Sequence, residues 1–158
     1  HLQAHHHDGL AVGILWAIGV LAEIVMFWFV PGLLARVGAS RLLSLCLAVG
    51  TLRWAVTAWF ADSFAMMALA QLTHALSFAM FQACMMQLMA GYFPGRRAAA
   101  GQSLLYGFSS GGGGVLGAAV AAVLWHFGRG EWAFLGGSAL TALAWMIYML
   151  RSRSTIVV

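Results

Sequence analysis

The chain has 158 residues, of which 63% are hydrophobic and only 8% are charged. Soluble domains carry about 25% charged residues, so this chain has too little charge to cover a water-facing surface. The composition excludes an ordinary soluble protein and predicts an integral membrane protein. The formal net charge of +4 comes from arginine without lysine, and in a membrane protein such charge orients helices rather than binding nucleic acid.

The chain begins with the polar segment HLQAHHHDG, which leads directly into an apolar run. The histidines at residues 5–7 could be a cloning remnant, a weak metal site or a polar loop. We favour a polar loop, because a metal site needs spaced ligands and groups that orient them. The segment lacks the basic region and cleavage site of a signal peptide. We therefore expect it to be part of a larger protein.

Membrane-spanning helices can be counted from the lengths of the apolar runs. A helix that crosses about 30 Å of hydrocarbon needs about 20 apolar residues, and lipid excludes open strands. Five stretches qualify, at about 10–34, 42–60, 64–91, 101–126 and 132–150. Short links make consecutive helices antiparallel neighbours. The predicted fold is all-α, a polytopic membrane bundle of five transmembrane helices.

The arginines predict the orientation of these spans. Pairs of arginines follow the first, third and fifth spans, whereas the other two links carry Asp62 and Arg129 with Glu131. The pairs are Arg36 with Arg41, Arg96 with Arg97, and Arg151 with Arg153. The positive-inside rule places them in the cytoplasm. We expect a multi-pass protein of the cell (inner or plasma) membrane with a cytoplasmic C-terminus and at least one further helix upstream.

Three ionisable residues remain inside the expected spans: Glu23, Arg53 and His74. A charge at the bilayer centre is costly, so such residues usually face a bundle interior or a cavity. The helical rise puts Arg53 about 13 Å and His74 about 18 Å below the outer edge, with Glu23 about 16 Å from the inner edge. The three can therefore meet near the midplane. They favour a transport or proton-relay site over an inert ion pair.

Polar side chains also follow one arc of the third span and one arc of the fourth, at spacings of three and four. Interhelical hydrogen bonds could explain any single member. Two polar stripes together with three charges favour a cavity instead. The candidate substrate-cavity residues are Gln71, Phe78, Gln82, Gln102 and Tyr106, with Trp16, Phe27 and Phe81 as further candidate aromatic walls.

The glycine-rich segment SSGGGGVLG at residues 109–117 lacks the Lys-Ser/Thr pair and the preceding strand of a phosphate loop. Gly113 and Gly117 instead have the spacing that lets membrane helices approach closely. We therefore expect a helix–helix contact at these two glycines.

Four segments resemble a known family: PGLLARVGASR, GVLAEIVMFWF, LRW and GQSLLYGFSSGGGGVLG. With five spans and midplane charges, residues 1–158 resemble a partial C-terminal transmembrane domain of a major facilitator superfamily transporter, covering the last five of twelve helices. The first segment is similar to the cytoplasmic motif between the eighth and ninth helices. It keeps Arg36 and Gly38, which the resemblance marks as gating residues, and departs from the motif at Pro31 and Ala35.

A closer similarity is to the proton-symporter branch that holds lactose permease, nucleoside permeases and 3-phenylpropionate permease. In the lactose permease pattern the eighth, ninth and tenth helices carry a Glu, an Arg and a His. Glu23, Arg53 and His74 fall on these positions. Ser77 stands where that pattern has a second acidic residue.

The sequence therefore predicts part of a proton-coupled symporter that moves a small organic solute by alternating access between two halves. Glu23 would carry the proton, Arg53 would favour its ionised form, and His74 would bind solute or relay a proton. The expected partners are the lipid bilayer, an N-terminal half, protons and the solute, without metal, cofactor or nucleic acid. An uncoupled facilitator or exchanger and a structural or receptor-like subunit are the alternatives. An enzyme is not expected.

Overall fold

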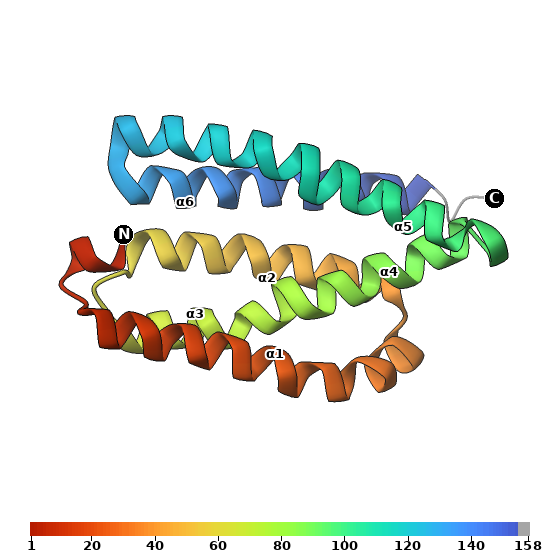
Figure 1. Ribbon diagram of the computed structural model, residues 1–158, viewed down its shortest axis with the longest axis horizontal. Coiled ribbons are helices and arrows are strands. Elements are labelled where there is room, and N and C mark those ends of the chain that lie inside the picture. The colour runs from red at the N-terminus through yellow and green to blue at the C-terminus, as the bar shows by residue number, and fades with distance from the viewer. Residues whose placement is uncertain (155–158) are drawn as a thin grey trace.

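The structure is a computed structural model that describes residues 1–154 of the chain. Within these residues the protein is all-helical, as expected, and its long helices run along one common direction (Figure 1). The Arg153 side chain lies outside the described part.

The first long helix and the link that follows it are defined by local capping. After the short η1 (Leu2–His5), Asp8 accepts a hydrogen bond from the Ala11 N–H at 2.7 Å and caps α1 (Gly9–Val37). Gly38 ends α1 with φ 86°, a backbone conformation that favours glycine. Its N–H donates to the Leu34 carbonyl, and α2 (Ala39–Trp59) begins at the next residue. The reversal between the first two spans therefore takes a single residue.

The third span is continuous but contains a π-helical segment. It consists of α3 (Phe64–Ala75), η2 (Leu76–Met80) and α4 (Phe81–Tyr92), and Ser63 caps its start. Such π segments are frequent at functional sites because they change the direction of neighbouring side chains. The segment η2 begins two residues after His74.

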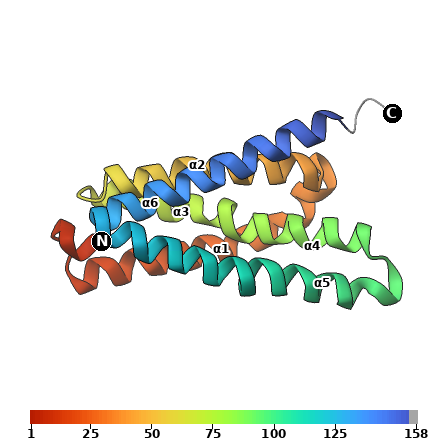
Figure 2. The ribbon, with the colours of Figure 1, turned by 90° about the horizontal axis from the view of Figure 1, so that it is seen from above.

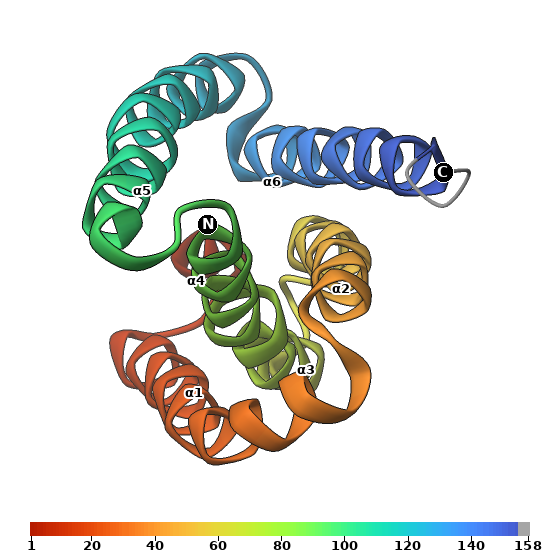
Figure 3. The ribbon, with the colours of Figure 1, turned by 90° about the vertical axis from the view of Figure 1, so that its right-hand side faces the viewer.

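The last helical stretch is the longest. It consists of η3 (Gly95–Arg97), α5 (Ala98–Tyr106), the π-helical η4 (Gly107–Gly113) and α6 (Gly114–Ser154). After a tight link, α5 runs back beside α4 (Figure 2). Inside α6 the backbone is not helical at Gly128 and Arg129. The ribbon reverses its direction at this point (Figures 1 and 3).

Within the described residues, four helices are long and apolar enough to cross a membrane: Gly9–Val37, Ala39–Trp59, Phe64–Tyr92 and Gly95–Ser152. The first three coincide with the expected spans. The two expected spans at 101–126 and 132–150 both lie inside the fourth, so the count is four rather than five. The reason is that the helical hydrogen-bond pattern continues on both sides of a break of only two residues.

Two packing contacts organise the bundle: α1 lies along α3, and α2 lies along the second part of α6. The second contact is joined by hydrogen bonds. The Trp145 indole N–H donates to Ser44 Oγ at 2.9 Å, and the Ser138 hydroxyl donates to the Thr51 carbonyl at 2.9 Å. A buried cluster joins α1, α2 and the third span: Val30, Ala39, Leu42, Leu43, Cys46, Met80 and Cys84. Cys46 and Cys84 are free thiols in this core, as expected.

The stretch from residue 102 to residue 127 contains no buried side chain, and its ribbon lies at the edge of the bundle (Figure 3). A Cβ added at Gly117 would meet nothing within 4 Å, and one at Gly113 would meet only the Phe108 carbonyl of the same helix. Within the described residues no other helix packs closely on these two glycines, so the helix–helix contact expected there stays a prediction. Residues 106–123 are all exposed.

Candidate functional site

Glu23 and His74 form an ion pair between the first and third spans. His74 Nε2 lies 3.0 Å from Glu23 Oε1, and the two side chains are only 27% and 21% exposed. They meet because α1 and α3 pack along each other and both residues lie near the middle of their spans. Two groups that can each bind a proton are thus in direct contact in the interior of a membrane protein.

Arg53 does not pair with Glu23, in contrast to the interaction expected from the sequence. Among the described ion pairs Glu23 has His74 as its partner, and none includes Arg53. The guanidinium carbon instead lies 4.0 Å from the ring centre of Trp54, a cation–π contact. The physical reason is packing, because α1 contacts α2 little and faces α3. Arg53 Nε is buried without a hydrogen-bond partner.

All three charged residues line one cavity of about 400 Å³. Its wall combines polar and ionisable side chains with aromatic and aliphatic ones. Such a combination is typical of sites for small organic molecules. The other side chains of the wall include Trp16, Trp54, Thr57, Gln71 and Phe134.

A second cavity of about 800 Å³ lies next to the first. Arg53, Trp54 and His74 line both cavities, so these three residues separate them. On the side of the second cavity, the His74 ring stacks on Phe78 with centroids 5.2 Å apart and planes 15° apart. The second cavity is also lined by Ser77, Phe81, Ser109 and Thr141. A movement of His74 that breaks the Glu23–His74 pair would therefore change the lining of both cavities.

His74 Nδ1 is buried without a hydrogen-bond partner, like Arg53 Nε. An unsatisfied buried polar group costs about 1–3 kcal/mol, and more when it is charged. Two such groups beside the same cavities would gain from a hydrogen-bonding molecule placed there. The arrangement is therefore suited to binding a polar or anionic group.

Residues 1–136 match the MFS_1 like family. The chain belongs to the MFS_1 like family. No curated protein and no solved structure matches it. With its long apolar helices, the chain is a membrane protein of a transporter family whose members are generally not enzymes. Membership in the MFS_1 like family points to secondary transport of a solute.

The other residues expected at the site divide into two groups. Gln71 lines the first cavity of this MFS_1 like protein, and Phe78 lines the second. Gln82 and Tyr106 lie outside both cavities, where Gln82 Nε2 donates to Tyr106 Oη at 2.7 Å. Gln102 is half-buried and lines neither cavity.

Among the aromatic candidates, Trp16 lines the first cavity and Phe81 the second, whereas Phe27 lines neither. The two residues expected to act in gating lie at the other end of α1. Arg36 is exposed in the last turn of α1, where its charge suits the negative end of the helix dipole.

Sequence reasoning missed Trp54 and Phe134, whose rings are stacked with centroids 5.6 Å apart in the wall of the first cavity. A signal for Phe134 was present. Phe134, Ser138, Thr141 and Trp145 recur at spacings of three and four, and they mark the face of α6 that packs on α2. From this stripe one could have predicted that the last span lines the site.

Proposed function

We propose that this chain is part of a proton-coupled symporter that moves a small organic solute by alternating access. The observation that carries the proposal is the Glu23–His74 pair at 3.0 Å in the wall of a cavity that Arg53 also lines. A carboxylate and an imidazole in contact can share one proton. A rearrangement that separates them changes how strongly each holds it.

Arg53 has a different role in this proposal from the one that the sequence alone suggested. Its guanidinium keeps its charge, and it has no carboxylate partner within the described residues. We propose that it holds an anionic or strongly polar group of the solute. The aromatic walls at Trp16, Trp54 and Phe134 would hold the apolar part. Proton and solute then meet at His74, which contacts Glu23 and lies next to the solute.

We further propose that the chain crosses the membrane five times. The last stretch has 58 residues, or about 87 Å of helix at 1.5 Å per residue, almost three times the hydrocarbon thickness of about 30 Å. The reversal at Gly128 and Arg129 would divide it into two crossings. The arginine pairs would then lie in the cytoplasm, and Arg36 and Gly38 would act there as parts of a gating link.

The exposed stretch at 102–127 supports a two-domain transporter. It carries the polar stripe with Gln102, Tyr106 and Ser109, and residues 106–123 are all exposed in the described chain. Polar groups on a lipid-immersed helix must face protein or water. We propose that the N-terminal half of the transporter packs on this face and completes the cavity between the two halves.

The test is an uptake assay with the complete transporter in proteoliposomes. A panel of radiolabelled aromatic acids, nucleosides and disaccharides would be offered with an inward proton gradient and again after an ionophore has collapsed it. We expect at least one compound to accumulate above its outside concentration only while the gradient is present. Saturable uptake that ignores the gradient would support an uncoupled facilitator. Failure of every compound to enter would favour a structural or receptor-like subunit.

A further inference from the structure

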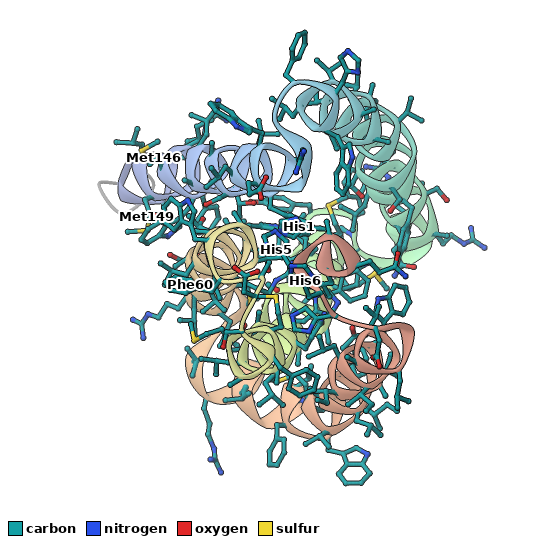
Figure 4. All side chains as sticks on the ribbon, turned by 90° about the vertical axis from the view of Figure 1, so that its left-hand side faces the viewer. His1, His5, His6, Phe60, Met146 and Met149 are labelled. Carbon is teal, nitrogen blue, oxygen red and sulfur yellow. The ribbon has the colours of Figure 1, made fainter. Side chains whose placement is uncertain are left out.

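A cluster of histidine and acidic side chains lies at the end of the bundle opposite the α1–α2 link. His1 and His5 come from the first residues of the chain, Asp62 from the α2–α3 link, and Glu131 from just after the reversal in α6. Figure 4 looks onto this end of the bundle and shows His1 and His5 close together near its middle. Their ring centroids are 4.6 Å apart. Three segments distant in sequence thus bring metal-ligating side chains to one place.

The hydrogen bond of His5 with Asp62 determines where the lone pair of its ring points. His5 Nδ1 lies 2.7 Å from Asp62 Oδ1, and a carboxylate oxygen accepts, so Nδ1 carries the proton. In the neutral ring, Nε2 then has a free lone pair, and it lies 3.3 Å from Glu131 Oε1. At this distance the two atoms can share either a proton, in the imidazolium form of the ring, or a metal ion bound to both. An imidazole held in this way by a carboxylate is the usual arrangement at zinc.

His1 is oriented in the same manner. Its Nε2 lies 3.0 Å from the Thr57 carbonyl oxygen, which can only accept, so Nε2 carries the proton and Nδ1 has the lone pair. His1 Nδ1 packs directly on Gly130, where a Cβ would lie only 2.2 Å from it. Glycine is therefore required for the imidazole to approach the residue next to Glu131. One ligand atom from each of His1, His5 and Glu131 lies within 4.8 Å of the others.

We propose that His1, His5 and Glu131 form a Zn²⁺ site, with Asp62 and the Thr57 carbonyl orienting the two imidazoles. Two imidazole nitrogens and one carboxylate oxygen are a common zinc ligand set. Ligands about 2.1 Å from a tetrahedral zinc ion lie about 3.4 Å from one another, close to the 3.3 Å between His5 and Glu131. Water would take the fourth position, because Glu131 is 39% exposed.

The site would control the end of the first cavity. His1, Leu2, Thr57 and Phe134 line that cavity, and they belong to the same three segments as the ligands and the groups that orient them. A bound Zn²⁺ would join these segments and hold that end of the cavity in one arrangement. Its effect on solute movement would be inhibitory. The site itself does not depend on the proposed function.

The test is Zn²⁺ binding to the purified protein in detergent micelles, measured by calorimetry and by metal analysis after dialysis. We expect one Zn²⁺ per chain with micromolar affinity. Glu131→Gln and His5→Gln should each weaken binding by at least about tenfold, and Asp62→Asn by about tenfold because it only orients His5. The matched control is His6→Asn, at an exposed residue with φ 63°, a conformation that asparagine accepts well. It should bind Zn²⁺ like the unchanged protein.

A second measurement covers variants that fold poorly. Co²⁺ added to the unchanged protein should give the visible absorption of a four-coordinate site, and stoichiometric Zn²⁺ should remove it. His74→Gln should leave both signals unchanged, which separates this cluster from the Glu23–His74 pair. Absence of Zn²⁺ binding at 100-fold molar excess, or full binding by both Glu131→Gln and His5→Gln, would overturn the proposal.

Discussion

Arg53 is the fixed positive charge of the first cavity, and its surroundings limit what can bind there. Its guanidinium lies over Trp54, and its Nε is buried without a partner. Removing a charged group from water is costly unless hydrogen bonds replace those of the solvent. An anionic group of a solute would supply those bonds. We propose that Arg53 thereby gives the cavity a preference for a solute of negative charge.

The first prediction concerns this residue. Arg53→Gln should weaken binding of the transported solute by at least about tenfold, because it removes a charge-assisted hydrogen bond worth about 1.5–3 kcal/mol. Arg53→Lys should restore binding only in part, since an ammonium lacks the planar fork of donors. Binding can be followed by quenching of tryptophan fluorescence, since Trp16 and Trp54 line the cavity. The control is Arg96→Gln, at an exposed residue that does not line the first cavity. Unchanged affinity in Arg53→Gln would exclude Arg53 from the solute site.

The Glu23–His74 pair makes a second prediction, on stability. Glu23→Gln leaves His74 without its charged partner, and breaking a buried ion pair costs about 3–5 kcal/mol when the remaining charge stays buried. If the pair only held helices together, Glu23→Gln would fold poorly and Glu23→Gln with His74→Gln would recover. We expect instead that both variants reach the membrane in similar amounts, because the pair lines a cavity and neither side chain is fully buried. The amount of folded protein, measured by fluorescence size-exclusion chromatography, decides between these outcomes.

At the scale of single elements, the tight link before α5 depends on one glycine. A Cβ at Gly101 would lie 2.7 Å from Phe93 Cγ, whereas a Cβ at Gly117 would meet nothing within 4 Å. Gly101 is buried and Gly117 is exposed. The close approach of backbone and ring at Gly101 therefore holds α5 beside the end of α4.

These two glycines give a matched pair of variants. Gly101→Ala should lower the melting temperature in detergent, because Phe93 must move away from its position. Gly117→Ala should leave it unchanged or raise it slightly, since alanine is favoured over glycine in a helix by up to about 1 kcal/mol. Thermal unfolding followed by circular dichroism provides the comparison. Equal melting temperatures for the two variants would contradict the packing described for Gly101.

The first three spans could be predicted closely from the sequence, because the length of an apolar run directly limits the length of a membrane helix. The two π-helical segments could not, because a π turn and an α turn accept the same apolar side chains. The sequence indicated that Glu23, Arg53 and His74 come together, because charge is rare in lipid, and all three line one cavity. The partner of Glu23 could not be predicted, because the sequence gives the depth of a residue in the membrane but not which helix it faces. Phe134 was missed for the same reason.

At the scale of the whole molecule, the arginine pairs lie at the end of the helices opposite the cluster of His1, His5 and Glu131. A topology experiment can test this arrangement directly. Cysteines introduced at Gln3 and at Ala35, both exposed, should react with a membrane-impermeant maleimide from opposite sides of the membrane, Gln3→Cys from outside. The unchanged protein is the control, since Cys46 and Cys84 are 1% and 0% exposed. Reaction of both introduced cysteines from the same side would contradict the proposed orientation.

The exposed stretch at residues 102–127 makes a further prediction for the molecule as a whole. Reconstituted without the proposed N-terminal half, the chain should not catalyse saturable uptake, since the pathway between the two halves would be incomplete. Uptake should appear when the two halves are reconstituted together. Saturable, stereospecific uptake by the chain alone would remove the basis for a two-domain transporter.

The central claim is that Glu23 carries the coupled proton, and one measurement tests it most directly. Proton-driven accumulation of the solute and its exchange without a gradient are compared for the complete transporter with glutamate or glutamine at residue 23, each normalised to folded protein in the membrane. Glu23→Gln keeps the size of the side chain and removes its titration. We predict that accumulation is lost while exchange survives at least in part. Normal accumulation by Glu23→Gln would contradict the account.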